Sequence, residues 1–337
     1  MSRKRILYLS SSIIPSRMAN SVHVMKMGEA FTYEGYDFTL IAGYNRKNSE
    51  LNVSDDYKFY GVENTFKIKK IWRPLIPAIG FLYYSIVSFL TVKRYKPDLV
   101  YGRNLLSCYL AALFGFDVII ECHAPPEDII RKLVFSLIIK NENCKVLVVI
   151  SKALREILVQ KHLGLLQNKR VIVAHDGVDI EKFSNRLTKS EARNLIGIPS
   201  NRFIIGYTGH LYRGRGFEII LELAKHSRDD LFIIVGGTED DIIRCKNEVG
   251  RNDLNNVIFF GYKPNSELLK YWCACDILIM PYQEKVNVAG NIGDTSRYMS
   301  PLKMFEYLAS GVPLISSDLP VLREVLKDGT NCLLVKP

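Results

Sequence analysis

The feature that most constrains the fold of this chain is an alternation of short apolar runs with helical patterns, which occurs twice along its 337 residues. Runs that are apolar throughout and separated by helices are typical of parallel strands. The apolar runs of the first half are RILYLSS, YDFTLIAG, PDLVYGR, DVIIECH and CKVLVVIS, and those of the second half are FIIGYTGH, DLFIIVGG, NVIFFGY, ILIMPY and VPLISSD. The sequence therefore predicts an α/β protein with two parallel-sheet domains, and its length fits two domains.

The halves are expected to meet near residues 163–170, which places one domain at residues 1–168 and the other at 169–337, with RVIVAHDGVD opening the second. Ligands of such sheets bind beyond the carboxyl ends of the strands. A cleft between two such domains is the expected active site.

The net charge indicates the class of binding partner, and the cysteines indicate the cellular compartment. The net charge is +10, and most of the excess falls in residues 1–150. Basic clusters interleaved with aromatic residues, which nucleic-acid binding would favour, are not found, so a phosphorylated substrate or an anionic membrane surface is the expected anionic partner. The seven cysteines contain no C-x-x-C pair and no signal peptide opens the chain, which predicts a cytoplasmic protein without a metal–thiolate centre.

Residues 75–92, LIPAIGFLYYSIVSFLTV, form an uncharged stretch between basic flanks. Its length is compatible with a transmembrane span. Pro77, Gly80 and the hydroxyl residues argue against a span, and a strand-like run follows directly. A buried or amphipathic helix is the favoured interpretation, with contact at a membrane surface as the alternative.

The loop GHLYRGRG, residues 209–216, joins a predicted strand to a predicted helix. Gly209 permits close backbone approach, a helix N-terminus offers free N–H groups, and Arg213 and Arg215 add fixed positive charge. Together these groups suit a diphosphate, although a solvated basic loop has the same composition.

The stretch SPLKMFEYLASG, residues 300–311, predicts a helix with Ser300 as its N-cap and Pro301 as its first residue. Lys303 adds positive charge near the start, where Leu302 contributes a free N–H group. Glu306 lies about 7–8 Å further along the axis at ~1.5 Å per residue. This spacing suits phosphates at the helix start and a ribose diol at Glu306, whereas a glutamate on a surface helix is the alternative.

These motifs together resemble the retaining glycosyltransferases of family 4, which have the GT-B fold of two Rossmann-like domains. The resemblance rests on HDGVDIEKF, GYTGHLYRGRG, FFGYKPNSELLKYWCACDILIMPY and SPLKMFEYLASGVPLISSDLPVLREVLKDGTNCLL in the second half. In the first half it rests on ANSVHVMKMGEAF, PDLVYGR and ECHAPPE. It implies an acceptor-binding N-terminal domain and a C-terminal domain that binds a nucleotide sugar. The chain ends at CLLVKP, where the family continues into further helices.

The resemblance also implies roles for individual residues. Arg215 corresponds to the cation that grips the donor diphosphate, whereas His210 stands where an arginine is common, which leaves that contact to Arg213. Glu306 corresponds to the second glutamate of an E-x7-E motif and would hold the ribose; the first falls at Tyr298. His123 corresponds to the histidine that reaches the transferred sugar, and Asn20 and Ser21 replace a Gly-Gly pair in the loop expected to meet the acceptor.

The implied reaction is transfer of a sugar from a nucleotide-diphosphate donor to a glycan or lipid-linked acceptor, with retention and without a metal or other cofactor. The departing diphosphate would be stabilised by cationic side chains and helix N-termini. Two alternatives stay open: a nucleotide-sugar 2-epimerase, and a non-catalytic subunit that binds sugar nucleotides, which Tyr298 in place of a glutamate favours. His23, His162 and His226 are expected to be surface or packing residues, His175 to lie in a turn at the junction, and Thr238–Asp241 to bind no metal.

Overall fold

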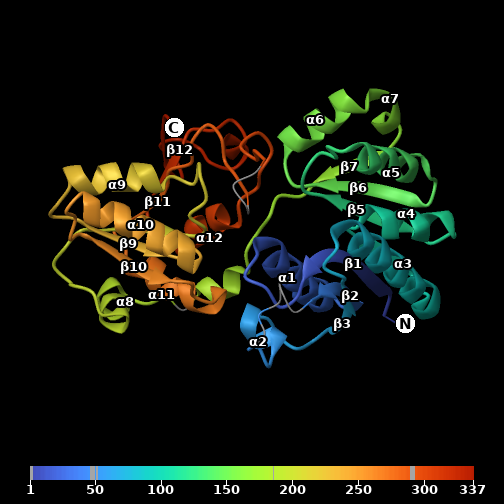
Figure 1. Ribbon diagram of the computed structural model, residues 1–337, viewed down its shortest axis with the longest axis horizontal. Coiled ribbons are helices and arrows are strands. Elements are labelled where there is room, and N and C mark those ends of the chain that lie inside the picture. Colours follow the sequence, from blue (N-terminus) through green and yellow to red (C-terminus); the bar gives the residue numbers. More distant parts are fainter. Residues whose placement is uncertain (1–2, 46–49, 51, 185, 289–292) are drawn as a thin grey trace. The chain divides into compact units, whose positions relative to one another are not determined.

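The computed structural model describes residues 3–45, 50, 52–184, 186–288 and 293–337, and it divides into two compact units (Figure 1). Unit 1 comprises residues 1–150 and 154–174, and unit 2 comprises residues 151–153 and 175–337. We expected the boundary after residue 168. It lies after Ala174 instead, because the strand Arg170–Val173, which we had assigned to the second half, pairs in parallel with Cys144–Val149 of the first.

Unit 1 is built on a parallel sheet of seven strands among its described residues, in the order β3-β2-β1-β4-β5-β6-β7. The strands are β1 (Arg5–Ile13), β2 (Asp37–Tyr44), β3 (Lys67–Trp72), β4 (Leu99–Gly102), β5 (Val118–Cys122), β6 (Cys144–Val149) and β7 (Arg170–Val173). The sequence prediction missed β3, KIKKIW, because this edge strand carries three lysines and only Ile71 of it is buried. Edge strands commonly carry such charges.

The helices of unit 1 connect these strands. They are α1 (Ala19–Tyr33), α2 (Asp56–Tyr60), α3 (Pro77–Tyr95), α4 (Leu105–Leu113), α5 (Ile129–Lys140), α6 (Lys152–Lys161) and α7 (Leu163–Leu166). The core packs α1 against β1 and β2 through Val24, Met25, Tyr8 and Phe38. This packing fixes the start of α1 beside the carboxyl end of β1.

Unit 2 holds a parallel sheet of six strands among its described residues, in the order β10-β9-β8-β11-β12-β13. The strands are β8 (Ile204–Thr208), β9 (Leu231–Val235), β10 (Val257–Gly261), β11 (Ile277–Met280), β12 (Leu314–Ser317) and β13 (Leu333–Val335). Every residue of β8 and β9 is buried, as expected for central strands covered on both faces.

The helices of unit 2 are α8 (Lys189–Ile196), α9 (Phe217–His226), α10 (Glu239–Arg251), α11 (Leu268–Cys273) and α12 (Leu302–Ser310), with short 3-10 helices at Ile180–Phe183, Asn265–Glu267 and Leu322–Glu324. Thr238 and Asp241 form a capping box at the start of α10. The helix predicted over LPVLREVLKDG is wrong, because only its middle forms a single 3-10 turn before a bridge between Asp328 and Cys332.

Both sheets reverse their strand order at one point, and ligands of open parallel sheets bind at such points beyond the carboxyl ends of the strands. In unit 1 the reversal falls between β1 and β4, and in unit 2 between β8 and β11. The predicted site residues of unit 2 follow β8 and β11, so the topology places them at this reversal.

Candidate functional site

The loop that follows β8 carries the predicted diphosphate-binding residues of unit 2. Gly209 has a φ of +130° and Gly216, the N-cap of α9, has a φ of +95°. A Cβ at Gly216 would lie 2.1 Å from the carbonyl oxygen of Pro281, so only glycine lets α9 begin against the segment that follows β11. The free N–H groups of α9 are thereby directed to the carboxyl edge of the sheet.

Arg215 is held in this loop by the segment after β11. Its Nε and Nη2 donate to the carbonyl oxygen of Asn287 at 3.2 and 3.1 Å, and its Nη1 donates to the hydroxyl of Tyr282 at 3.3 Å. The guanidinium is therefore fixed in position before any ligand arrives. Arg213 lies two residues earlier and is exposed to solvent.

Lys303, on the first turn of α12, places its ammonium beneath the same loop. Its Nζ lies 3.9 Å from the centre of the Tyr207 ring and 5.4 Å from that of Tyr282. It is buried and has no hydrogen-bond partner among the described residues. Burial, with Arg215 nearby, holds the pKa of Lys303 well below its usual range, and Glu306 only partly offsets this. A buried cation without a hydrogen-bonded partner is costly, and an anionic ligand would relieve that cost.

Lys303 also lies close to Gly209, the glycine that follows β8 and has a φ of +130°. A Cβ at Gly209 would lie 2.8 Å from Nζ of Lys303. The glycine therefore leaves room for the lysine to reach the backbone of the loop.

His210 contributes no fixed positive charge to this group. Its ring stacks on Tyr212 at 4.7 Å, and its Nδ1 is buried without a hydrogen-bond partner among the described residues. Burial, with the charges of Arg215 and Lys303, lowers the pKa of His210 to about 4, so the ring is neutral near pH 7. The cations available to a diphosphate are Arg213, Arg215 and Lys303.

Helix α12 begins one residue later than predicted. Pro301 is its N-cap and Leu302 its first residue, and Ser300 lies outside the helix. The hydroxyl oxygen of buried Ser300 accepts a hydrogen bond from the N–H of Asp176 at 3.0 Å, so it does not cap the helix. A proline N-cap has no side-chain oxygen to offer, which leaves the first N–H groups of α12 for another acceptor.

Glu306 is positioned by a neighbour that the sequence did not single out for this role. Its Oε1 accepts a hydrogen bond of 2.7 Å from Nδ2 of Asn265, in the 3-10 turn after β10. The next residue, Tyr307, lies in the core, and its hydroxyl oxygen accepts a hydrogen bond of 2.7 Å from the N–H of Thr208 at the end of β8. The helix is thus tied to β8, and the carboxylate of Glu306 is oriented beside it.

Tyr298, which stands where the resemblance expects the first glutamate, is 9% exposed. Its carbonyl oxygen accepts a hydrogen bond of 2.8 Å from the hydroxyl of Ser151. The residue lies in a turn just before α12 and brings no carboxylate to the site. The segment before it includes residues 289–292, which lie outside the described part of the chain.

The predicted site residues of unit 1 lie at the carboxyl ends of β1 and β5. Asn20 is exposed on the first turn of α1. Ser21 is fully buried, and its hydroxyl donates to the carbonyl oxygen of Ile13 at 2.9 Å. The hydroxyl oxygens of Ser21 and Ser16 lie 2.7 Å apart. The side chain of Ser21 therefore holds the start of α1 in place, which argues against the acceptor contact that we expected of it.

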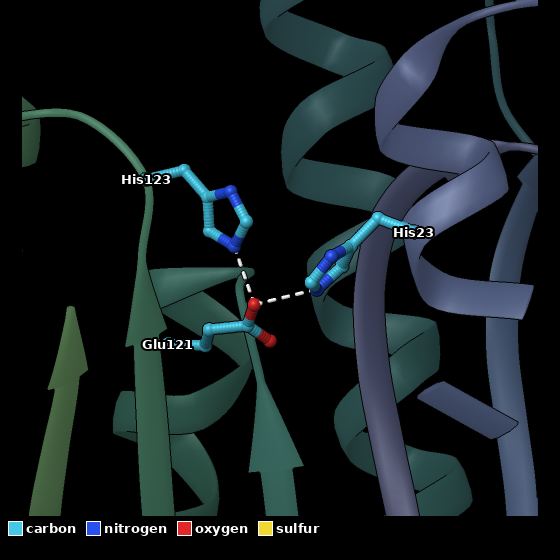
Figure 2. Close-up of side chains that lie close together, drawn as sticks. All are labelled: His23, Glu121 and His123. Atoms are coloured by element: carbon cyan, nitrogen blue, oxygen red, sulfur yellow. Dashed lines mark hydrogen bonds and ion pairs between the residues drawn. The ribbon is translucent and has the colours of Figure 1, made fainter. Parts of the chain in front are cut away.

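His123 follows β5 and belongs to a cluster with Glu121 and His23 (Figure 2). The Nε2 atoms of both histidines point to the same oxygen, Oε1 of Glu121, and the contact from His23 measures 2.7 Å. Our interpretation of His23 as a plain surface or packing residue was incomplete, because its ring contacts this buried carboxylate. The other oxygen of Glu121 accepts a hydrogen bond of 2.7 Å from the hydroxyl of Tyr8.

His175 donates or accepts a hydrogen bond of 2.8 Å with Oε2 of Glu324. The same carboxylate accepts bonds from the N–H groups of Lys152 and Ala153. Glu324 therefore anchors the short segment of residues 151–153 to the rest of unit 2, and His175 contacts the same carboxylate.

Comparison with known proteins agrees with the two parallel sheets. The structure of a glycosyltransferase of Rickettsia africae aligns with this chain with a TM-score of 0.73 and 16% identity. The alignment covers all of this chain and 85% of the Rickettsia chain. The Anabaena protein HepE, solved in complex with UDP and glucose, has a TM-score of 0.72 and 16% identity, and the match covers 99% of this chain and 86% of that one. The fold of this chain is therefore GT-B.

Family models identify the family. The model described as glycosyltransferase family 4 matches residues 21–182, and the one described as glycosyl transferases group 1 matches residues 202–337. A putative teichuronic acid biosynthesis glycosyltransferase, TuaH of Bacillus subtilis, is 30% identical over 154 residues, covering 45% of this chain and 35% of TuaH. The chain belongs to the family 4 glycosyltransferases.

Two further observations limit what membership of this family implies for the chain. The chain spans less than half the length of the curated relatives that it matches. Within the part of the chain that the structure describes, no helix combines the length and apolar character that crossing a membrane requires, and this includes α3.

Proposed function

We propose that this protein transfers a sugar from a nucleotide-diphosphate donor to a hydroxyl group of a glycan or lipid-linked acceptor. The observation that carries the proposal is the buried ammonium of Lys303 beside the fixed guanidinium of Arg215, at the point where the strand order of unit 2 reverses. A fixed guanidinium, a lysine that can take up a proton as an anion binds, and two helix N-termini at such a point form an anion site.

The nucleoside would occupy the remaining space along α12. Glu306 lies one turn beyond Lys303 on the same helix, and an ionised carboxylate can accept two hydrogen bonds from a ribose diol. Oε1 of Glu306 already accepts a hydrogen bond from Asn265, which orients the carboxylate for this contact.

The proposed chemistry follows from this charge distribution. As the bond from the anomeric carbon to the diphosphate breaks, the acceptor oxygen bonds to that carbon and the proton of the acceptor hydroxyl passes to the departing diphosphate. Negative charge grows on this leaving group, and groups fixed in advance stabilise it without reorganisation. Because Arg213, Arg215 and Lys303 supply the positive charge, the proposed mechanism does not call on a metal ion. Transfer with retention of configuration rests on the family alone.

For the donor and acceptor we propose a UDP-sugar and a cell-envelope polysaccharide. HepE, which shares the fold, was solved with UDP and with UDP-glucose, and TuaH is named for teichuronic acid biosynthesis. All seven cysteines are free and buried, which suits a cytoplasmic site of action.

The test is donor turnover, with released nucleoside diphosphate and sugar products identified by mass spectrometry. The protein is incubated with a panel of nucleotide sugars, with and without polyprenyl-linked and oligosaccharide acceptors. Acceptor-dependent release with a glycosylated product supports the proposal. Epimerised sugar formed without acceptor would assign the 2-epimerase instead, and binding without turnover would assign a non-catalytic subunit.

We further propose that unit 1 rests on an anionic membrane surface. Helix α3 buries Tyr84, Phe89 and Val92 together with small and hydroxyl residues, and it exposes other large apolar side chains. Helix α5 likewise exposes apolar side chains, and α4 packs against both helices. The α3–α5 surface comprises Ile79, Leu82, Ile86, Leu90, Phe114, Ile130 and Leu133.

Such an exposed apolar area on a folded chain marks an interaction surface. Basic side chains lie within it: Lys93 is 4.9 Å from the centre of the Phe114 ring, and Arg94, Lys96, Arg131 and Lys132 are exposed nearby in sequence. Apolar residues framed by cations favour a bilayer that contains anionic lipid, which would also present a lipid-linked acceptor.

A further inference from the structure

The cluster of His23, Glu121 and His123 in unit 1 is more than a packing contact. Glu121 lies in β5 and His123 directly follows its last residue, and the side chains of both point toward His23 (Figure 2). His23 reaches them from α1, and its ring meets that of His123 edge to face at 4.8 Å (Figure 2). Three polar side chains from two distant parts of the sequence thus converge.

We propose that Glu121 is a positioning residue that holds His123 with its proton on Nε2, so that Nδ1 of His123 accepts a hydrogen bond from a substrate hydroxyl. This inference rests on the proposed transfer to or from a sugar, and it adds the working atom of His123 and the residues that select it.

The side chain of Glu121 carries a negative charge near neutral pH. Burial by itself would raise the pKa of this carboxyl, but the hydrogen bond from His123 and the close contact with His23 outweigh burial and hold the pKa well below its usual range. The carboxylate is therefore ionised near neutral pH, and an ionised carboxylate only accepts hydrogen bonds. Any imidazole nitrogen bonded to it must carry a proton.

The geometry of the cluster shows which nitrogen of each histidine meets Glu121. The nitrogen of His123 that meets Oε1 of Glu121 is Nε2, and the nitrogen of His23 that meets the same oxygen is also Nε2. Tyr8 donates to the opposite oxygen at 2.7 Å. Donors on both oxygens fix the carboxylate, so it in turn fixes the tautomer of His123.

The ring of His123 is mainly neutral near pH 7. Burial and the neighbouring charge of Arg103 lower the pKa of His123, and Glu121 opposes them only in part. Near pH 7 the ring is therefore mainly neutral, and with the proton on Nε2 it keeps a lone pair on Nδ1. The ionisable groups that surround His123 are Glu121 on β5, His23 on α1 and Arg103 after β4. Tyr8 and Tyr101 lie on the far side of the Glu121 carboxylate.

The consequence is a preference for one chemical class of partner. A lone pair on Nδ1 accepts from a hydroxyl, whereas an ionised phosphate has no proton to donate. His123 is therefore suited to a sugar or acceptor hydroxyl and not to the diphosphate, which agrees with the cations being gathered in unit 2.

Two substitutions separate the nitrogens of His123. Asparagine places an amide group near the position of Nδ1, and glutamine places it near that of Nε2. We expect His123→Asn to keep a larger kcat than His123→Gln, with a loss of roughly tenfold or more in the glutamine variant and little change in the KM for the donor. Equal losses, or a better glutamine variant, would overturn the proposal.

A second measurement does not depend on turnover. Nitrogen-15 NMR of the imidazoles reports which ring nitrogen bears the proton, and His226→Gln, which replaces an exposed histidine, assists assignment. We expect Nε2–H at His123 in the wild type, and Glu121→Gln should lower the pKa of His123 further because it removes the carboxylate charge. Protonated Nδ1 in the neutral ring, an unchanged or raised pKa in Glu121→Gln, or a stoichiometric metal ion on the Nε2 atoms would contradict it. If no donor is turned over, the proposed function fails while this measurement still tests the tautomer.

Discussion

The ammonium of Lys303 lies 3.9 Å from the centre of the Tyr207 ring and is shut off from water. A cation over an aromatic face gains roughly 0.5–2 kcal/mol, which does not replace full hydration of an ammonium. The same lysine lies beside Arg215, whose charge further disfavours the protonated form. The site therefore holds a lysine that is poised to change its charge when an anion binds.

This arrangement predicts that nucleoside diphosphate binding takes up a proton. The pKa of Lys303 is lowered in the free protein, and a bound diphosphate favours the charged form, so at a pH above the lowered pKa binding adds a proton. Affinity should accordingly fall as pH rises through that region. Calorimetry in buffers of different ionisation enthalpy measures the uptake, and Lys303→Met should abolish it. Uptake that persists in Lys303→Met would assign the proton to another group.

The pair of Asn265 and Glu306 predicts a coupled effect on nucleoside binding. Glu306→Gln should weaken binding roughly tenfold or more, since hydrogen bonds to a charged group contribute about 1.5–3 kcal/mol. Asn265→Ala should have a smaller effect, and that effect should shrink in the Glu306→Gln background because Asn265 acts through Glu306. The double-mutant cycle is read from dissociation constants, and strictly additive losses would refute the coupling.

Much of unit 2 could be predicted because its site residues lie in two short segments, each a strand end followed by a helix start. Gly209, Arg215, Lys303 and Glu306 were all predicted as site residues in this way, and their positions depend on local backbone geometry. The N-cap of α12 was misplaced, because the hydroxyl of Ser300 bonds to Asp176, which is 124 residues away. A capping pattern does not reveal a competing donor that tertiary structure supplies.

Unit 1 was less predictable for the same physical reason. The strand order brings α1 close to the end of β5, so that His23 reaches Glu121 across 98 residues of sequence. Neither residue stands in a recognisable motif spacing with the other. The packing of α3 was also only partly predictable. Periodicity predicts that large side chains face inward, and Tyr84, Phe89 and Val92 are indeed buried. Small residues are buried beside them where neighbours approach closely, since a Cβ at Gly80 would lie 2.2 Å from the carbonyl oxygen of Pro74.

The link between α12 and β8 predicts a stability effect. Tyr307→Phe removes the hydroxyl that accepts from the N–H of Thr208 and leaves that buried group without its partner. We expect the free energy of unfolding to fall by about 1–3 kcal/mol. Urea denaturation followed by fluorescence measures the change, and Tyr33→Phe, at a largely exposed tyrosine, should be neutral. A loss no larger than in this control would show that the bond contributes little.

The α3–α5 surface predicts membrane association. The protein should sediment with vesicles that contain anionic lipid and be released by salt, since salt screens the cationic contribution. Leu82→Ser with Ile130→Ser should reduce the bound fraction, whereas Leu195→Ser with Ile243→Ser, at apolar residues of unit 2 that are also exposed, should not. Equal binding to neutral vesicles would remove the electrostatic part of the proposal, and self-association lost in the first variant would assign the surface to a second copy.

The central claim is that unit 2 binds a nucleoside diphosphate through Arg215, and equilibrium binding tests it most directly. Calorimetric titrations with UDP, GDP, ADP and dTDP identify the preferred ligand of the wild type. For that ligand we expect Arg215→Ala to raise the Kd roughly ten- to a hundredfold, as loss of about 1.5–3 kcal/mol implies. Arg251→Ala, at an exposed arginine of α10, should leave the Kd unchanged. A Kd that is the same in wild type and Arg215→Ala, or no binding of any of the four, would contradict the account.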